Sequence, residues 1–325
     1  MSNNTAAAGR SGAAAALIFL LAAACSDPAA TSPEIPRLGA PLAAKNGPNA
    51  LPTTGRIFFA SGQTGNHELY SVNPDGTDLR RLTYTTGNED YPSVSNDGRK
   101  LVYLKSAPNS PQNIWTANTD GSRQRLLFSA PVGMAIQSAR FSPDGRQIAV
   151  SFAEISTQKF RVGVMDANGG SLTVLTTGDD TGRLPSWSPD GLQLAFFGTT
   201  PGVDGAQVFT MNVDGTNRQQ RTSIDPTTFG CCKFAEWSPD GSQILFATQE
   251  VSNGFDTQMY SLRTADWSTQ FIGPPNLTLN PPAWSPDGTR ILFKNATNLS
   301  WMYANGYGAT PVISSQDPIG FSWSR

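Results

Sequence analysis

Charged side chains gather in two short segments that could bind a cation or a basic peptide. Glu89 and Asp90 form one group, and Asp179, Asp180 and Arg183 form the other. Carboxylate oxygens are the ligands that hard cations prefer, and they also attract basic peptides. Each group lies close to the start of a predicted strand. We therefore take these five residues as candidates for a binding rim, with ordinary solvated loop charges as the alternative.

A pair of adjacent cysteines, Cys231 and Cys232, is the second chemical feature, and Cys25 is the third cysteine of the chain. Two such thiols are open to oxidation in an extracytoplasmic environment. Adjacent alpha carbons are about 3.8 Å apart across a trans peptide, below the usual disulfide range, so this bond would be strained and readily reduced. We favour a vicinal disulfide that stiffens a loop. Buried free thiols and a redox or metal role are the alternatives.

The inventory of residues speaks against most enzyme classes. His67 is the single histidine, so a site built on several histidines is excluded. A glycosidase that uses only paired carboxylates stays open, because that reaction needs no histidine. The formal charge is -2, without a run of Lys and Arg, which excludes a nucleic-acid footprint. We expect a binding protein without metal, cofactor or catalytic residues.

A recurring turn indicates the elements that position these residues. Ser142-Pro143-Asp144-Gly145 recurs from residues 188, 238 and 285, and Ser95-Asn96-Asp97-Gly98 is a variant; successive serines are 47, 46, 50 and 47 residues apart. This period matches a four-stranded propeller blade of roughly 40 to 50 residues. Pro presets the bend and Gly takes the left-handed position, so each copy predicts a hairpin. The repeated aspartates are therefore predicted to be structural, although they resemble a set of calcium ligands.

One apolar position of the repeat occurs six times in the chain, which predicts six blades. This residue precedes each turn serine and is usually large: Val94, Phe141, Trp187, Trp237, Trp284 and Trp323. A second Asp-Gly or Asn-Gly turn follows in most blades, whereas blade five has Ala265-Asp266-Trp267 there. The chain enters with a second strand at residues 56–59 and finishes with a first strand at 321–324. We predict an all-β, six-bladed β-propeller closed by pairing of these strands.

The repeats resemble those of TolB-like six-bladed propellers, which carry Trp-Ser-Pro-Asp-Gly-x-x-Ile-x-Phe and then Ile-Tyr-x-x-x-x-Asp-Gly and Leu-Thr. The resemblance covers residues 53–325 and implies the fold. Its family includes a periplasmic component of a cell-envelope complex, and similar propellers accompany serine peptidase domains. The separate N-terminal α/β domain of TolB proper is not expected, since only a Pro- and Ala-rich stretch precedes the first strand.

The first residues are typical of an export signal. Residues 13–24 are apolar and stop at Cys25. Such a run is shorter than the roughly 20 residues of a membrane span and fits a signal peptide. Leu-Ala-Ala-Ala-Cys resembles a bacterial lipobox, which implies lipid on Cys25, and Ser26 after it implies the outer membrane. We predict a signal at 1–24, a lipidated tether at 25–52 and the propeller at 53–325.

The propeller topology places the variable loops together. Both turn families lie on one rim, and the other rim carries residues 84–90, 129–137, 176–183, 222–233 and 273–280, where binding residues are expected. Arg140 and Glu236 share a repeat position that is small in other blades. Because they lie two blades apart, we predict separate hydrogen-bonding roles for them.

The predicted function is that of a monomeric, lipid-anchored envelope propeller that binds a protein or peptide. The alternative is a propeller that binds or cleaves glycans. That alternative is favoured if Trp115, Trp267, Trp301 and Tyr307 are exposed together on one rim.

Overall fold

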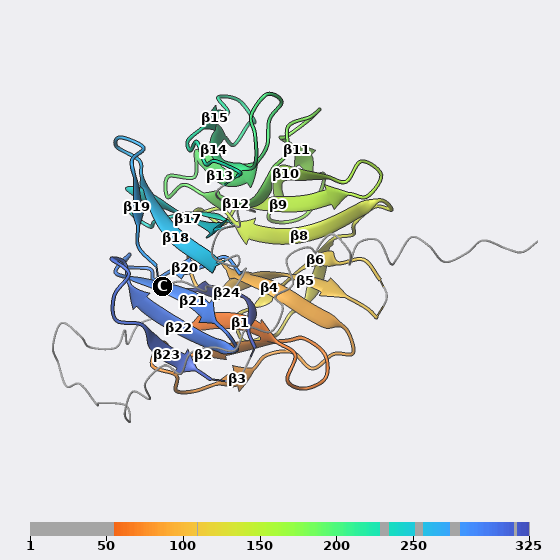
Figure 1. Ribbon diagram of the computed structural model, residues 1–325. Coiled ribbons are helices and arrows are strands. Elements are labelled where there is room, and N and C mark those ends of the chain that lie inside the picture. The colour runs from red at the N-terminus through yellow and green to blue at the C-terminus, as the bar shows by residue number, and fades with distance from the viewer. Residues whose placement is uncertain are drawn as a thin grey trace, which may run out of the picture. The chain divides into compact units, whose positions relative to one another are not determined.

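Repeated hairpins build the fold of residues 55–108, 110–227, 234–250, 256–273, 280–314 and 317–324, which the computed structural model describes. In these residues 24 β-strands form six four-stranded antiparallel sheets, without an α-helix. The sheets follow one another around a ring as the blades of a propeller (Figure 1). This confirms the predicted six-bladed, all-β fold. Within the same residues no helix is long and apolar enough to span a membrane.

Each blade runs from an inner strand at the central channel to an outer strand. Blade 1 contains β24 (Ile319–Trp323), β1 (Ile57–Ser61), β2 (Glu68–Val72) and β3 (Arg80–Arg81). Blade 2 contains β4 (Asn88–Val94), β5 (Lys100–Ser106), β6 (Asn113–Asn118) and β7 (Arg125–Phe128). Blade 3 contains β8 (Met134–Phe141), β9 (Gln147–Glu154), β10 (Lys159–Asp166) and β11 (Thr173–Val174).

The remaining three blades follow the same order from inside to outside. Blade 4 contains β12 (Arg183–Trp187), β13 (Gln193–Gly198), β14 (Gln207–Asn212) and β15 (Gln219–Gln220). Blade 5 contains β16 (Ala235–Trp237), β17 (Gln243–Glu250), β18 (Asp256–Arg263) and β19 (Thr269–Phe271). Blade 6 contains β20 (Ala283–Trp284), β21 (Arg290–Asn295), β22 (Asn298–Tyr303) and β23 (Thr310–Ile313).

The ring closes in blade 1, where the two ends of the propeller pair. In Figure 1 the orange β1 lies beside the blue β24, and the antiparallel register places Ile57 opposite Trp323. The Ser324 amide donates to the Arg56 carbonyl at 2.9 Å and extends this pairing. Because β1 and β24 pair, neither strand presents an exposed sheet edge where the ring closes. The predicted strand pairing is thus confirmed.

The repeated aspartates close their own turns. The Ser142 hydroxyl donates to Asp144 Oδ1 at 2.6 Å, and the Arg146 amide donates to the same oxygen at 3.1 Å. Gly145 has φ of 71°, the left-handed conformation that the bend requires. The equivalent hydrogen bonds recur at Asp97, Asp190, Asp240 and Asp287. Each carboxylate thus has the same backbone role in its blade, as predicted.

Blade-to-blade packing forms the core. The second strands are buried on both faces because each blade lies between two others; Leu194, Phe196 and Phe197 of β13, for example, are all buried. Burying a side chain of this size contributes roughly 1.5–3 kcal/mol. Phe196 also stacks on Phe209 of β14, with ring centroids 5.8 Å apart. These contacts hold the inner strands in place around the channel.

Candidate functional site

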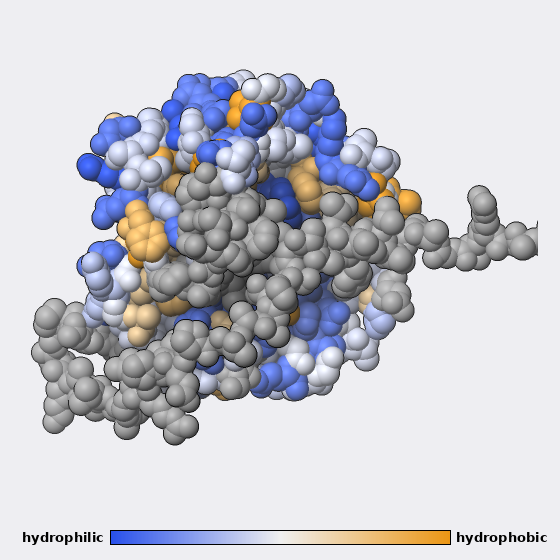
Figure 2. Space-filling view, viewed as in Figure 1, coloured by the Kyte–Doolittle hydropathy of each residue, from blue (hydrophilic) through white to orange (hydrophobic). Residues whose placement is uncertain are grey.

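Two rims follow from the antiparallel order of the strands. The turn rim carries the Ser-Pro-Asp-Gly turns and the second turns. The loop rim carries the connections between second and third strands and those between blades. The face shown in Figure 2 is mostly hydrophilic, and its apolar residues form small, separate patches. The binding candidates from the sequence all lie at the loop-rim ends of strands.

Glu89 and Asp90 lie in β4 and are buried. Glu89 is fully buried, forms a 2.8 Å ion pair with Lys105 of β5, and accepts a 2.5 Å hydrogen bond from the Thr85 hydroxyl. The interpretation of these two carboxylates as solvated loop charges is therefore wrong. They belong to a buried polar cluster between blades 1 and 2, which also contains Glu68.

Two buried glutamates of this cluster have pKa values shifted in opposite directions. Burial raises the pKa of Glu89, and the ion pair with Lys105 only partly offsets it. Burial also acts to raise the pKa of Glu68, but hydrogen bonds from Thr83, from the Thr85 amide and from Arg81 together lower it. Arg81 lies 2.8 Å from Glu68 Oε1. A pair of carboxyls with divergent pKa values could serve acid-base chemistry, yet here salt bridges and amides already hold the carboxylates.

Asp90 joins this cluster to the single histidine. His67 Nδ1 lies 2.7 Å from Asp90 Oδ1, and Nε2 of the Gln112 side chain donates to Asp90 Oδ2 at 3.1 Å. The hydrogen bond to Asp90 raises the pKa of His67 despite the opposing effect of burial. His67 therefore gains charge at a higher pH than a free histidine does.

The second group of candidates lies between blades 3 and 4 with partners of its own. Asp179 is exposed and pairs with Lys159 at 2.5 Å, while Asp180 pairs with Arg218. Arg183 begins β12, and its guanidinium lies 3.9 Å from the centre of the Phe160 ring. These partners differ from those of Glu89 and Asp90. The structure thus divides the five candidates into a buried pair, Glu89 and Asp90, and a second group in which Asp179 and Arg183 are exposed and Asp180 is half-buried.

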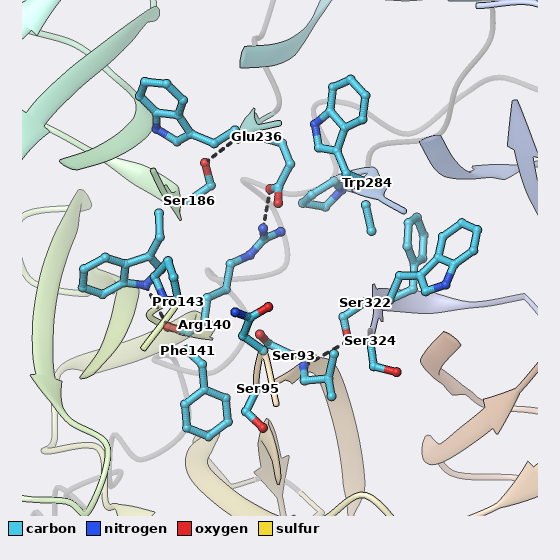
Figure 3. Close-up of a pocket in the computed structure, with 18 of the residues that line it drawn as sticks. Ser93, Ser95, Arg140, Phe141, Pro143, Ser186, Glu236, Trp284, Ser322 and Ser324 are labelled. Atoms are coloured by element: carbon cyan, nitrogen blue, oxygen red, sulfur yellow. Dashed lines mark hydrogen bonds and ion pairs between the residues drawn. The ribbon is translucent and has the colours of Figure 1, made fainter. Parts of the chain in front are cut away.

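Arg140 and Glu236 form an ion pair across the central channel (Figure 3). They come from β8 and β16, with blade 4 between them. The prediction of separate hydrogen-bonding roles is therefore wrong. Ring closure turns the inner strands toward one axis, so residues 96 positions apart in the chain meet. Burial raises the pKa of Glu236, and Arg140 partly offsets that effect.

Serines occupy other positions of this inner ring and connect neighbouring blades. The Trp237 amide donates to the Ser186 hydroxyl at 3.1 Å, and the Val94 amide donates to Ser322 at 3.2 Å. In both contacts the amide lies on the inner strand of the blade next to that of the serine. The channel encloses a cavity of about 270 Å³. This space suits a few side chains of a partner better than a large ligand.

Three exposed apolar side chains lie on the loop rim of blades 1 to 3. Val132 is fully exposed, Tyr84 is 75% exposed and Ile155 is 42% exposed. The Ile155 amide donates to the Gly133 carbonyl at 2.9 Å, so the loops that carry Ile155 and Val132 lie side by side. Tyr84 and Val132 lie in the predicted loop segments 84–90 and 129–137 but were not among the predicted site residues. Their apolar character within polar loops was the available signal.

Several predicted features fall outside the described residues. Cys25, Cys231 and Cys232 lie there, so lipidation and the vicinal disulfide stay predictions. Among the residues that the structure does describe, no group of three His, Cys, Asp or Glu side chains could hold a metal ion. The aromatic residues of the glycan alternative are not gathered on one rim. Trp301 is buried in the core, whereas Tyr307 is exposed on the turn rim.

Comparison with known proteins agrees with the blade architecture. The model of the TolB beta propeller domain matches residues 129–305. The chain belongs to the TolB beta-propeller family. A relative in this family, the protein TolB homolog of Chlorobium chlorochromatii, is 34% identical over 141 residues, which are 43% of this chain and 30% of that protein. The chain also covers less than half the length of the other curated relatives it matches.

Solved structures show the TolB-type fold in proteins of different function. TolB from Acinetobacter baumannii has a TM-score of 0.68 at 17% identity, over 84% of this chain and 67% of that one. Oligogalacturonate lyase from Vibrio parahaemolyticus has a TM-score of 0.56 at 17% identity, over 80% of this chain and 74% of that one. At such identities the likeness shows the fold alone, and the function must be argued from the site.

Proposed function

We propose that this TolB-family propeller is an exported, lipid-anchored envelope protein that binds a protein partner through the loop rim. The observation that carries the proposal is the pair of exposed apolar side chains on adjacent loops there, Val132 and Ile155, with Tyr84 also exposed on the same rim. Large apolar side chains gain little by facing water, and grouped ones are typical of protein interaction surfaces. The channel ion pair of Arg140 with Glu236 lies at the turn-rim ends of β8 and β16 and is not part of this surface.

The buried cluster behind this surface supports a scaffold role. The His67–Asp90 contact and the hydrogen bond from the Thr83 hydroxyl to Glu89 join the loop-rim ends of blades 1 and 2 to each other. A rigid base lowers the conformational entropy lost on binding. Attachment through Cys25 and a location at the outer membrane are part of the proposal, and they rest on the resemblance of residues 21–25 to a lipobox.

Photocrosslinking in intact cells tests the partner-binding surface. A photoreactive amino acid at position 132 is expected to capture one discrete protein, and the matched control at position 192 is not. Leu192 suits this purpose because it is 64% exposed but lies in a turn on the opposite rim. Ile155→Asp should then abolish the adduct from position 132. Equal capture from both positions, or from neither, would contradict the proposed surface.

Membrane fractionation tests the anchor separately. The wild-type chain is expected in the membrane fraction, and Cys25→Ser is expected in the soluble exported fraction because it lacks a site for lipid. Metabolic labelling with a palmitate analogue should mark the wild type alone. An unlabelled wild-type chain would contradict lipidation and leave the crosslinking result unaffected.

A further inference from the structure

One blade interface departs from a packing rule that the others obey. At each regular interface, the glycine of the second turn packs against the outer-strand segment of the preceding blade, which carries an aliphatic residue. The pairs are Gly76 with Val312, Gly121 with Leu82, Gly169 with Leu127, Gly215 with Leu175 and Gly306 with Ile272. Backbone and small side chains thus close these interfaces tightly.

Both members of the pair differ between blades 4 and 5. The turn from β18 to β19 is one residue longer, and Trp267 takes the left-handed position of the glycine, with φ of 57°. Arg221 replaces the aliphatic residue: its amide donates to the Val208 carbonyl, as that of Leu82 does to Leu69. The Arg221 guanidinium lies 3.8 Å from the centre of the Trp267 ring. A bulky residue in a conformation suited to glycine is a recurrent mark of functional sites.

A cavity of about 600 Å³ lies at this interface. Phe246, Tyr260 and Trp267 provide aromatic walls, and Thr222, Ser223 and Thr269 are among the polar lining residues. Asp225 also lines the cavity, and its Oδ1 accepts hydrogen bonds from the Thr227 amide and hydroxyl. Thr248 also lines the cavity. It is 2% exposed, and its hydroxyl has no hydrogen-bond partner among the described residues. A buried hydroxyl at the wall of a cavity is suited to a polar ligand, since leaving it unpaired is unfavourable.

Arg221 supplies a cation to the same cavity. Its Nε donates to the Thr210 hydroxyl at 2.9 Å, which orients the guanidinium. Within the described part of the chain, no carboxylate forms a salt bridge with Arg221. Burial lowers the pKa of Arg221, which reflects a cation that is partly removed from water. A planar guanidinium fixed in this way suits a carboxylate, which it can bind through two parallel hydrogen bonds.

We propose that the cavity between blades 4 and 5 binds an acidic sugar, that is, a pyranose ring with a carboxylate. Aromatic walls match the apolar faces of the ring, and Thr248 with its polar neighbours matches the ring hydroxyls. Arg221 matches the carboxylate. The volume lies within the roughly 300–1,000 Å³ of small-molecule pockets. The lining includes Thr222 and Ser223 of the loop-rim segment 222–233 but none of the exposed residues Tyr84, Val132 and Ile155, so this site does not depend on the partner proposed there.

Calorimetric titration of the full chain in detergent tests the site with two matched probes. The probes are the trimer of β-1,4-linked glucuronic acid and cellotriose, its neutral counterpart. The acidic trimer is expected to bind about tenfold or more tightly than cellotriose, because the Arg221 contact is a charge-assisted hydrogen bond. Raising the salt concentration should weaken binding of the acidic trimer only.

Two variants restore the residues of the other blades and keep the fold. Arg221→Leu should weaken the acidic trimer about tenfold or more without affecting cellotriose, and Trp267→Gly should weaken both. Arg99→Leu is the matched control, since Leu192 occupies the equivalent turn position in blade 4. Equal affinity of the acidic trimer for wild type and Arg221→Leu would overturn the proposal. Failure of both trimers to bind wild type at millimolar concentration would do the same.

Discussion

Replacing Arg140 by serine leaves the Glu236 carboxylate in the channel without its partner. Removing one member of a fully buried ion pair costs about 3–5 kcal/mol of unfolding free energy. The side chains of Arg140 and Glu236 are 21% and 17% exposed, so some water reaches them. We therefore expect a loss of about 2 kcal/mol for Arg140→Ser, and about the same for Glu236→Ser.

The double variant distinguishes an ion pair from two independent contacts. Serine is found at this position in blades 1, 2 and 4, as Ser322, Ser93 and Ser186. The double variant Arg140→Ser with Glu236→Ser therefore gives blades 3 and 5 the residue that these three blades have. We expect the double variant to lose about 1 kcal/mol, rather than the roughly 4 kcal/mol of an additive pair. Urea denaturation of the four proteins measures this coupling. Additive losses would refute the mutual stabilisation inferred from the structure.

The pH dependence provides an internal check on the same variant. Burial raises the pKa of Glu236, and loss of Arg140 raises it further. In the folded Arg140→Ser protein the Glu236 carboxyl then keeps its proton to a higher pH than it does in the unfolded chain. Its stability relative to wild type should fall as the pH rises above about 4.5. A constant difference between pH 4 and pH 7 would contradict the buried-carboxylate explanation.

Further perturbations probe other parts of the propeller. The hydrogen bond to Asp90 raises the pKa of His67. The stabilisation of the fold by this pair should therefore be fullest below about pH 6.5 and decline as the pH rises through the pKa of His67 in the folded protein. At high pH the urea midpoints of wild type and His67→Gln should converge. Trp323→Ala should cost about 3–5 kcal/mol, since the ring-closing tryptophan is buried, and a loss below about 1 kcal/mol in urea denaturation would contradict its role in closure. Asp144→Ala should cost about 1 kcal/mol through lost turn hydrogen bonds, and calorimetry should show unchanged ligand binding. Mass spectrometry after thiol alkylation without reductant should find Cys231 and Cys232 unmodified if they are bonded.

The hairpin register explains why the buried cluster escaped prediction. Counting outward from the turn at residues 95–98 would place Asp90 opposite Lys105. The strand contains a bulge between Asp90 and Ser93, where Tyr91 has φ of 52°, and Glu89 lies opposite Lys105 instead. A shift of one residue moves a side chain to the other face of a strand. The sequence contains no glycine at Tyr91 that would have signalled the bulge.

Local patterns determined much of this protein. The period of the Ser-Pro-Asp-Gly turns, the apolar residue before each and the exceptional turn of blade five were all legible, because turns and strand alternation depend on neighbouring residues. Tertiary structure alone decided which distant residues meet. Closure of the ring brought Arg140 to Glu236, and blade packing brought Arg221 to Trp267. Such contacts depend on the angle between blades, which the summed packing of six interfaces determines and no single segment encodes.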